Sequence, residues 1–303
     1  MVRLMLLDSA SLYFRAFFAY RDHEALTAPD GTVVNALRGM VEFIATLADK
    51  HEPDAIVACW DDAWRPQWRV DLISSYKTQR AEADGAEIDT TEGLLGPQVP
   101  LIAEVLGLLG IPVIGAPDCE ADDVIGTLST QADGPVDIVT GDRDLFQLVD
   151  DARGVRVLYP AIGGIRDAQV VTGEWMVGKY GVRPDQYVDY SVMRGDASDG
   201  LPGVAGIGEK TAANLLAEFT DLDGILAAAA DPASSLKPRV RASLLESTDY
   251  IAAAREVVAV RRDALPASTY VLTPVDETAF GAFAERWGLG SAAERVLKAL
   301  SRT

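Results

Sequence analysis

The sequence predicts an α/β fold whose mainly parallel central sheet is covered by helices on both faces. Two observations lead to this prediction: short apolar runs alternate with segments of helical periodicity, and acidic residues recur just after the apolar runs. Helices are expected at 11–20, which is rich in aromatic residues, and at 35–50, where Met40 and Ile44 share one face. The strands are expected at 2–7, 55–60, 111–114, 136–139 and 155–158.

The composition is that of a globular protein without a membrane segment. The 303 residues, 49% of them hydrophobic, can form one large domain or two modest ones with an ample core. No uncharged apolar run approaches about 18 residues, so neither a membrane span nor a signal peptide is expected, and a cytoplasmic location follows. Cys59 and Cys119 show no metal-binding spacing, and two histidines, His23 and His51, leave little room for histidine-based catalysis or zinc sites.

The net charge of −19 argues against a protein that binds nucleic acid through overall basic charge. It does not exclude a nucleic-acid enzyme. Acidic side chains gathered in a metal site are neutralised there, and a basic face elsewhere can still contact phosphates.

Acidic residues follow four of the expected strands. They are Asp8, Asp61, the group Glu120, Asp122 and Asp123 at the start of an expected helix, and the pair Asp142 and Asp144. The carboxyl ends of parallel strands meet at one edge of the sheet, where open α/β sheets bind ligands. Carboxylates this close repel one another unless they are protonated or bound to a cation. The pattern therefore predicts a shared cation site, and Asp62 is interpreted as a solvated neighbour of it.

Basic and aromatic residues interleave between residues 64 and 80. They are Arg65, Arg69, Lys77 and Arg80 with Trp64, Trp68 and Tyr76. This mixture suits contact with phosphates and bases, but a helix of tryptophan and arginine packed on the core would look similar, and both interpretations stay open. Residues 81–96 are acidic and weakly periodic, so a mobile loop is expected there.

A glycine-rich stretch from Gly195 to Thr211 leads into an expected helix at 210–219. Its spacing imitates a phosphate loop, but Glu209 stands where that motif needs lysine, so nucleotide binding is rejected. As a hairpin that feeds a helix, the stretch offers backbone N–H groups and Lys210 to a phosphate. The chain beyond residue 232 is expected to be helical.

These stretches resemble the 5′-nuclease family, which includes flap endonucleases and the amino-terminal exonuclease domain of bacterial DNA polymerase I. The motifs are Glu120-Ala-Asp-Asp123, Thr140-Gly-Asp-Arg-Asp-Leu145 and Gly195-Asp-Ala-Ser-Asp-Gly-Leu-Pro-Gly-Val-Ala-Gly-Ile-Gly-Glu-Lys-Thr211. The resemblance covers nearly the whole chain. It implies a PIN-like nuclease core over 1–180 with a helical arch at about 76–98. It also implies a mostly helical DNA-binding part over 181–303, with a glycine-rich helix-hairpin-helix at 195–211.

The resemblance also implies a set of metal ligands by position. The set is Asp8, Asp61, Glu120, Asp122, Asp123, Asp142, Asp144, Asp196 and Asp199. One ion would be surrounded by Asp8, Asp61, Glu120 and Asp122, and a second by Asp142, Asp144 and Asp199. Asp123 and Asp196 would bind directly or through water, and a third ion is compatible with the set. Carboxylate ligation favours Mg²⁺ or Mn²⁺ over zinc.

Catalytic and substrate-binding roles follow from the same resemblance. Asp8, Asp122 and Asp142 are expected to act with Lys77, since family members place a lysine at the foot of the arch against the scissile phosphate. Further contacts with DNA are expected from Arg69, Tyr76, Arg80, Gly203, Gly206, Gly208, Lys210 and Thr211. In the family the hairpin also carries a potassium ion on main-chain carbonyls.

The implied activity is flap endonuclease and 5′–3′ exonuclease cleavage of branched or gapped DNA with a 5′ end or flap, in replication and repair. The implied protein is a monomer that works beside a DNA polymerase and a ligase, without a membrane. Ser9 stands where the polymerase domain has glycine, and the arch segment after Arg80 is longer and unusually acidic. The chain ends at Thr303 without a polymerase, as in a free-standing nuclease.

Three other functions share part of this pattern. A PIN-type ribonuclease shares the acidic core but lacks the glycine-rich hairpin and the arch. A phosphohydrolase of the haloacid dehalogenase kind needs Asp-x-Asp after the first strand, whereas Ser9 and Ala10 follow Asp8 here. A nuclease-dead protein that binds DNA structures would not need the full carboxylate set.

The acidic insert yields a prediction from sequence alone. We expect Glu82, Asp84, Glu87, Asp89 and Glu92 to oppose entry of a 5′ strand by like-charge repulsion, which acts over roughly 8–10 Å at physiological ionic strength. Replacing all five by Ser or Gln should tighten flap binding, most strongly at low salt. A gain in affinity that does not change between low and physiological salt would show that this loop does not face the DNA.

Overall fold

The computed structural model describes residues 2–19, 26–78, 93–267 and 270–301. Arg80, the acidic insert and most of the expected arch at 76–98 therefore lie outside the described residues. None of the helices in the described parts of the chain is long and apolar enough to cross a membrane.

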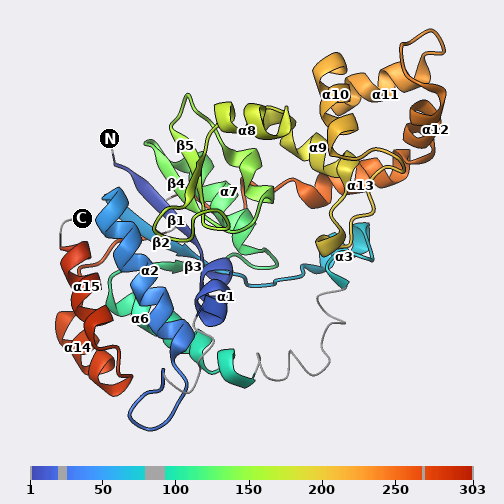
Figure 1. The fold of residues 1–303 in the computed structure, drawn as a ribbon. Helices are drawn as coiled ribbons and strands as arrows, with labels where there is room; N and C mark the ends of the chain where they lie inside the picture. The colour runs from blue at the N-terminus through green and yellow to red at the C-terminus, as the bar shows by residue number, and fades with distance from the viewer. Residues whose placement is uncertain (1, 20–25, 79–92, 268–269, 302–303) are drawn as a thin grey trace.

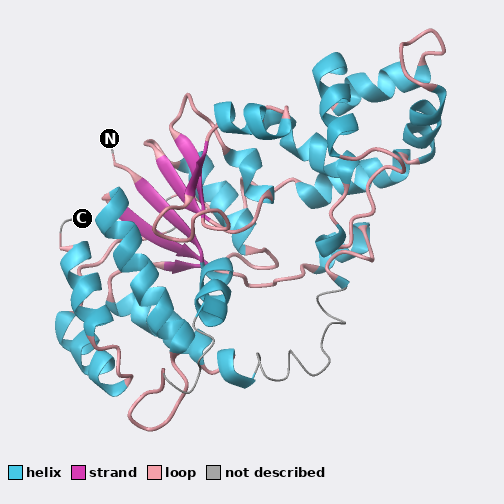
Figure 2. Ribbon diagram, viewed as in Figure 1, coloured by secondary structure: helices cyan, strands magenta, loops and turns pink. Residues whose placement is uncertain are grey.

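A six-stranded sheet forms the centre of the fold (Figure 2). Its strands are β1 (Leu4–Asp8), β2 (Ala55–Cys59), β3 (Val113–Ile114), β4 (Val136–Val139), β5 (Val155–Tyr159) and β6 (Gln169–Val171). The spatial order is β3-β2-β1-β4-β5-β6, with β1 to β5 parallel and β6 antiparallel to β5. Because the chain places β2 and β3 on one side of β1 and β4 on the other, the order reverses between β1 and β4. Open α/β sheets bind ligands beyond the carboxyl ends of the strands at such a point.

Helices cover both faces of the sheet, as the sequence predicts. Alternate residues of β1 divide between two cores: Met5 and Leu7 face one side, and Leu4 and Leu6 the other. The helices of the core are α1 (Ser9–Ala19), α2 (Asn35–His51), α3 (Gln67–Leu72), α6 (Gln98–Leu108) and α7 (Ala121–Gln131). Buried residues of α1, α2 and α6 belong to the first core, and those of α7 to the second.

A second group of helices extends away from the sheet, at the upper right of Figure 1. They are α8 (Gly173–Tyr180), α9 (Tyr187–Arg194), α10 (Glu209–Phe219), α11 (Leu222–Ala230), α12 (Pro238–Glu246) and α13 (Thr248–Val258). Short 3-10 helices η2 (Asp144–Leu148), η3 (Pro184–Gln186) and η4 (Ala197–Asp199) connect the parts. Contacts of α9 with η2 and of α13 with α3 join this helical part to the α/β core.

The last two helices return to the core. In Figure 1, α14 (Glu277–Arg286) and α15 (Ser291–Leu300), drawn in red, lie beside α2 and α6. Phe280 and Val296 are fully buried in the same core as α2, and Arg295 forms an ion pair with Glu42. These helices therefore do not belong spatially with the DNA-binding part expected over 181–303.

Two strands differ from the prediction. The strand expected at 111–114 is reduced to Val113 and Ile114, because Pro112 has no N–H to donate and contributes only its carbonyl, to Ala58 N at 2.9 Å. The sixth strand was not expected, and it adds an antiparallel edge through pairing of Val157 with Val171.

Candidate active site

Two neighbouring strands hold the centre of the site. Asp8 ends β1, and the turn after β4 begins with Thr140. The Thr140 hydroxyl donates to Asp8 Oδ2 at 2.6 Å and accepts the N–H of Asp142 at 2.8 Å, while Ser11 N donates to Asp8 Oδ1 at 3.1 Å. These bonds fix one carboxylate and position the turn that carries the next.

The N-terminus of α7 brings a second group of carboxylates to the same edge. Glu120 is the N-cap residue, and Asp122 and Asp123 lie in the first turn, where the helix dipole favours negative charge. Asp61, which follows β2, accepts the N–H of Ala121 at 2.8 Å. Asp62 instead accepts the N–H of Asp118 at 3.0 Å, outside this group.

Burial and mutual repulsion raise the pKa of the central carboxyls. Burial, together with the charges of Asp61 and Asp142, raises the pKa of Asp8 to about 7 despite its hydrogen bonds. Burial raises the pKa of Asp122 well above its usual range, and Asp142, Asp8 and Glu120 add to the effect. The pKa of Asp144 is raised in the same way by burial, then by Asp142 and Asp199. Such a cluster is stabilised by added cations.

The donor set fits hard divalent cations, although the side chains do not converge fully. Among the residues that the structure describes, no group of three or more His, Cys, Asp or Glu side chains lies close enough to hold a metal ion as placed. The carboxylates nevertheless repel one another electrostatically in two groups, and Asp142 belongs to both. The other members of the first group are Asp8, Asp61, Glu120 and Asp122, and those of the second are Asp144, Asp196 and Asp199. Oxygen donors of this kind are the ligands of Mg²⁺ and Mn²⁺.

Asp196 and Asp199 come from the helical part. Asp196 Oδ1 accepts the N–H of Ser198 at 3.0 Å, and Oδ2 lies 3.3 Å from Arg194 Nη2. Burial acts to raise the pKa of Asp196, but the hydrogen bonds from Ser198 and the charge of Arg194 outweigh it and lower that pKa. The carbonyl of Asp199 accepts the N–H of Lys77 at 2.9 Å, so η4 contacts the foot of the expected arch.

Tyr76 and Lys77 point into the site. Tyr76 is 5% exposed and donates its hydroxyl to Glu120 Oε1 at 2.8 Å, and Lys77 is 8% exposed and forms an ion pair with Glu120 Oε2. The Tyr76 side chain is therefore directed at Glu120 in this structure, and its expected contact with DNA stays a prediction. Lys77 has a left-handed backbone with φ of 51°, an unfavourable conformation for a side-chain-bearing residue that is often found at functional sites.

Arg69 and Asp123 pair with each other inside the protein. Arg69, expected to contact DNA, is only 2% exposed and forms a two-pronged ion pair with Asp123, at 2.7 and 2.9 Å. Asp123, expected to contribute to the metal site, is fully buried. Of the two interpretations left open for residues 64–80, packing on the core describes Arg69 in this structure.

The glycine-rich stretch forms a hairpin between α9 and α10. Gly203 and Gly206 have φ of 71° and 79°, which side-chain-bearing residues rarely adopt. Val204 and Ile207 are buried beneath it, whereas Gly206, Gly208 and Lys210 are exposed and Thr211 is half-buried. The exposed residues are thus available for contact with a phosphate backbone.

Three residues of the site lie outside the set that the sequence predicts. Thr140 and Ser11 link the turn after β4 to β1: besides the bonds above, the Ser11 hydroxyl accepts the N–H of Gly141 at 2.8 Å. Arg15, one turn further along α1, has its guanidinium beside Gly141 and adds a positive charge to an acidic edge. The one sequence signal for Ser11 and Arg15 is their position three and seven residues after Asp8, which is the spacing of one helix face.

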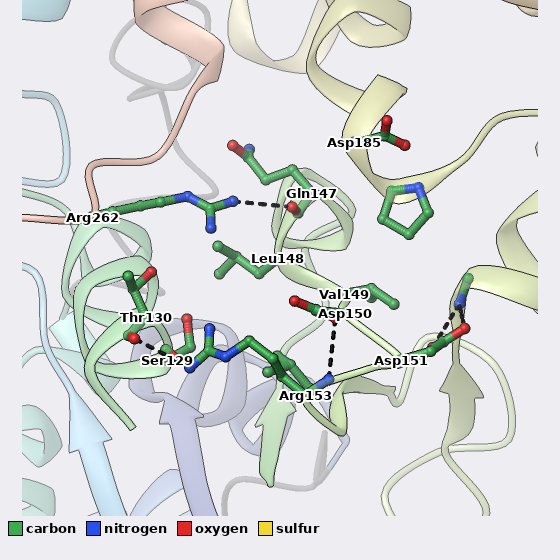
Figure 3. Close-up of a pocket in the computed structure, with 13 residues that line it drawn as sticks. Ser129, Thr130, Gln147, Leu148, Val149, Asp150, Asp151, Arg153, Asp185 and Arg262 are labelled. Carbon is green, nitrogen blue, oxygen red and sulfur yellow. Dashed lines mark hydrogen bonds between the residues drawn. The ribbon is translucent and has the colours of Figure 1, made fainter. Parts of the chain in front are cut away.

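A separate cavity of about 380 Å³ lies away from the carboxylates. It is lined by the C-terminal end of α7, the segment after η2, the start of α8 and Arg262. Figure 3 shows Arg262 reaching the carbonyl of Gln147, with Asp151 and Asp185 on the opposite side. Thr130 lies at the end of α7 opposite to Glu120, and none of the described site residues lines this cavity, so it is not part of the candidate active site.

Known structures share this fold at low sequence identity. The bacteriophage T5 flap endonuclease, in a complex with DNA and metal ions, superposes with a TM-score of 0.69 at 18% identity, covering 99% of both chains. The catalytic core of Rad2 in complex with a DNA substrate superposes with a TM-score of 0.58 at 17% identity, covering 98% of this chain and 91% of that chain.

Sequence relatives are much closer. A 5′-3′ exonuclease of Streptomyces coelicolor is 52% identical over 98% of this chain and all of its own length, and one of Mycobacterium tuberculosis is 42% identical over 98% and 97%. DNA polymerase I of Mycobacterium tuberculosis is 38% identical over 88% of this chain but 28% of its own length. Family models of the 5′-3′ exonuclease match the N-terminal resolvase-like domain at residues 3–181 and the C-terminal SAM fold at 182–277. The chain therefore belongs to the 5′-3′ exonuclease family.

Proposed function

We propose that this protein is a structure-specific 5′-nuclease that hydrolyses DNA phosphodiesters at 5′ flaps and 5′ ends with divalent metal ions. The observation that supports this most is the gathering of partly and fully buried carboxyls with raised pKa values at the reversal point of the sheet. This edge lies between the core and a helical part with an exposed glycine-rich hairpin. Membership of the 5′-3′ exonuclease family supports the same activity.

Asp8, Asp61, Glu120 and Asp122 would hold one ion, and Asp142, Asp144 and Asp199 a second. We propose Mg²⁺ or Mn²⁺, because the donors are oxygens. When bound, divalent ions would supply a hydroxide for attack and would neutralise charge on the phosphoryl and leaving oxygens. Thr140 and Ser11 keep Asp8 oriented, and Lys77 provides positive charge beside Glu120. We assign Arg15 to a phosphate near the Gly141 turn.

We assign cleavage to the core at 1–180 and duplex contact to the helical part that begins at 181, excluding α14 and α15. The hairpin would bind the phosphate backbone through exposed amides and Lys210, which gives position without reading sequence. A potassium ion on its main-chain carbonyls is part of this proposal and rests on the family resemblance. A monomer acting with a DNA polymerase and a ligase in the bacterial cytoplasm is the setting we propose.

Lys210→Ala is expected to weaken binding to a 5′-flap severalfold, with the single-turnover cleavage rate unchanged. The slope of log affinity against log salt concentration should become shallower by about one, because one fewer counterion is released from the DNA. Its charge is exposed at the start of α10. Lys298→Ala on α15 is the matched control and should leave affinity unchanged. Equal salt slopes for wild type and Lys210→Ala would remove Lys210 from the DNA-contacting surface.

The function itself is tested with a 5′-flap labelled at either end, incubated with Mg²⁺, Mn²⁺ or EDTA. We expect metal-dependent cleavage at the junction, releasing the flap as a fragment. Preferential cleavage of RNA hairpins would favour a PIN-type ribonuclease instead. Binding of flapped DNA without any cleavage in Mg²⁺ or Mn²⁺ would favour a nuclease-dead binder.

A further inference from the structure

Asp123 differs from the other carboxylates because its hydrogen-bonding capacity is filled. Oδ1 accepts Arg69 Nη2 at 2.7 Å and the N–H of Arg261 at 2.9 Å. Oδ2 accepts Arg69 Nη1 at 2.9 Å and the N–H of Glu120 at 3.3 Å. A carboxylate has about four lone-pair positions, so no position on Asp123 is left to bind a metal ion.

Asp122, its neighbour on α7, is the natural comparison. It is half-buried and accepts no hydrogen bond from the residues that the structure describes, and its ionised form is opposed by this burial and then by the charges of Asp142 and Asp8. Asp123 is fully buried and its charge is matched by a guanidinium that is itself only 2% exposed. The charge of Asp122 is therefore repelled by its neighbours, whereas the charge of Asp123 is neutralised by Arg69.

Arg69 joins three segments that are distant in sequence. From α3 it reaches Asp123 and Glu120 at the start of α7, and its Nε donates to the carbonyl of Val257 at 3.0 Å, in the last turn of α13. Trp68 reinforces this junction, because the guanidinium groups of Arg69 and Arg261 both lie over its ring, at 4.4 and 4.2 Å from the ring centroid. The junction thus ties the helical part, through α13, to the helix that presents the carboxylates.

Glu120 connects this junction to the candidate catalytic residues. Its Oε1 receives both Arg69 Nη1, at 3.1 Å, and the Tyr76 hydroxyl, while its Oε2 pairs with Lys77. A shift of Arg69 would therefore move Glu120 and, through it, the lysine at the foot of the arch.

We propose that Asp123 is not a metal ligand, and that Arg69 and Asp123 form a positioning pair that fixes Glu120 relative to α13. The pair sets the placement of the metal-binding edge against the DNA-binding helices. Arg69 then acts from inside the protein rather than by touching DNA. This inference rests on the proposed two-ion site for its catalytic consequence, but the ion pair itself can be tested without metal.

The test compares adjacent substitutions in metal-free protein. Asp123→Asn is expected to lower the melting temperature, by roughly 5–10 °C, because it leaves the buried Arg69 without its main partner. Asp122→Asn, the matched control, should leave the melting temperature unchanged or raise it, because it removes a repelled charge. Calorimetric titration with MnCl₂ should show weakened binding for Asp122→Asn and nearly wild-type binding for Asp123→Asn. Equal loss of Mn²⁺ affinity in both variants would make Asp123 a ligand and overturn the proposal.

A double variant distinguishes a positioning role of the Arg69–Asp123 pair from a purely stabilising one. Arg69→Met/Asp123→Leu leaves no lone buried charge, so it should melt above the Arg69→Met single variant. Its flap affinity, measured in EDTA, should stay within about threefold of wild type, while its single-turnover rate falls roughly tenfold to a hundredfold through misplaced groups. A double variant that regains both stability and rate would reduce the pair to a structural role.

A tenfold loss of affinity in the stable double variant would make Arg69 a DNA contact and would also contradict the proposal. Failure of the proposed function has a different signature. Wild-type protein would then show no metal-dependent cleavage, whereas the order of melting temperatures in metal-free protein would be unaffected.

Discussion

Asparagine in place of Asp122 is expected to lower the rate of 5′-flap cleavage at least about 1000-fold, while affinity for the same DNA stays within about threefold. The amide keeps the shape of the side chain but removes the charge that would hold a metal ion. Substrate contacts at the hairpin are untouched, so binding should persist. Rates are measured in single turnover with excess enzyme, and affinity is measured in EDTA.

The electrostatics of the site sharpen this prediction. Burial and the charges of Asp142 and Asp8 raise the pKa of Asp122 well above its usual range, so its ionised form destabilises the metal-free fold at neutral pH. The loss of activity should therefore come without a loss of melting temperature. Asp62→Asn is the control, since Asp62 contacts Asp118 rather than the cluster. Turnover above a few per cent of wild type in both Asp122→Asn and Asp142→Asn would contradict the two-ion assignment.

Lys77→Met is expected to reduce cleavage roughly 100-fold or more, with flap affinity changed only a few fold. Burial alone would lower the pKa of Lys77, but Glu120 and Asp199 raise it above its usual value, so the side chain stays charged. That charge is needed most where phosphoryl charge develops. Lys50→Met, an exposed lysine at the end of α2, serves as the control.

The structure adds a second consequence to the Lys77 prediction. Because Lys77 is the partner of Glu120 Oε2, its removal should also lower the melting temperature of metal-free protein by a few degrees. Glu120 keeps Arg69 and Tyr76 as partners, which limits the loss. A loss of affinity as large as the loss of rate would instead make Lys77 an ordinary substrate contact.

The central sheet could be predicted because its signals are local. The runs at 136–139 and 155–158 are short, apolar and bounded by turn residues, and β4 and β5 occupy them. The antiparallel strand Gln169–Val171 carries too few residues for a periodic signal. The packing of α14 and α15 against the α/β core could not be predicted either. The sequence of an amphipathic helix shows which face is apolar but not which element covers that face.

The sequence could predict that the carboxylates gather at one edge, because the reason is general. It could not predict how the neighbouring side chains Arg69 and Tyr76 are used. Acidic residues after parallel strands must meet at one edge, whatever the loops do. Whether an arginine faces DNA or the interior depends on contacts distant in sequence: Arg69 is buried because Asp123, Glu120 and Val257 O surround it. The same holds for Tyr76, whose hydroxyl is bound by Glu120.

The most direct test of the account is anomalous diffraction at the manganese edge from crystals soaked in MnCl₂. We expect manganese peaks within coordinating reach of Asp122 and Asp142. Asp8 should bind one ion and Asp144 the other, with Asp123 still paired with Arg69. Manganese sites that involve neither Asp122 nor Asp142, or no ordered manganese in crystals of protein that is active in the same solution, would contradict it.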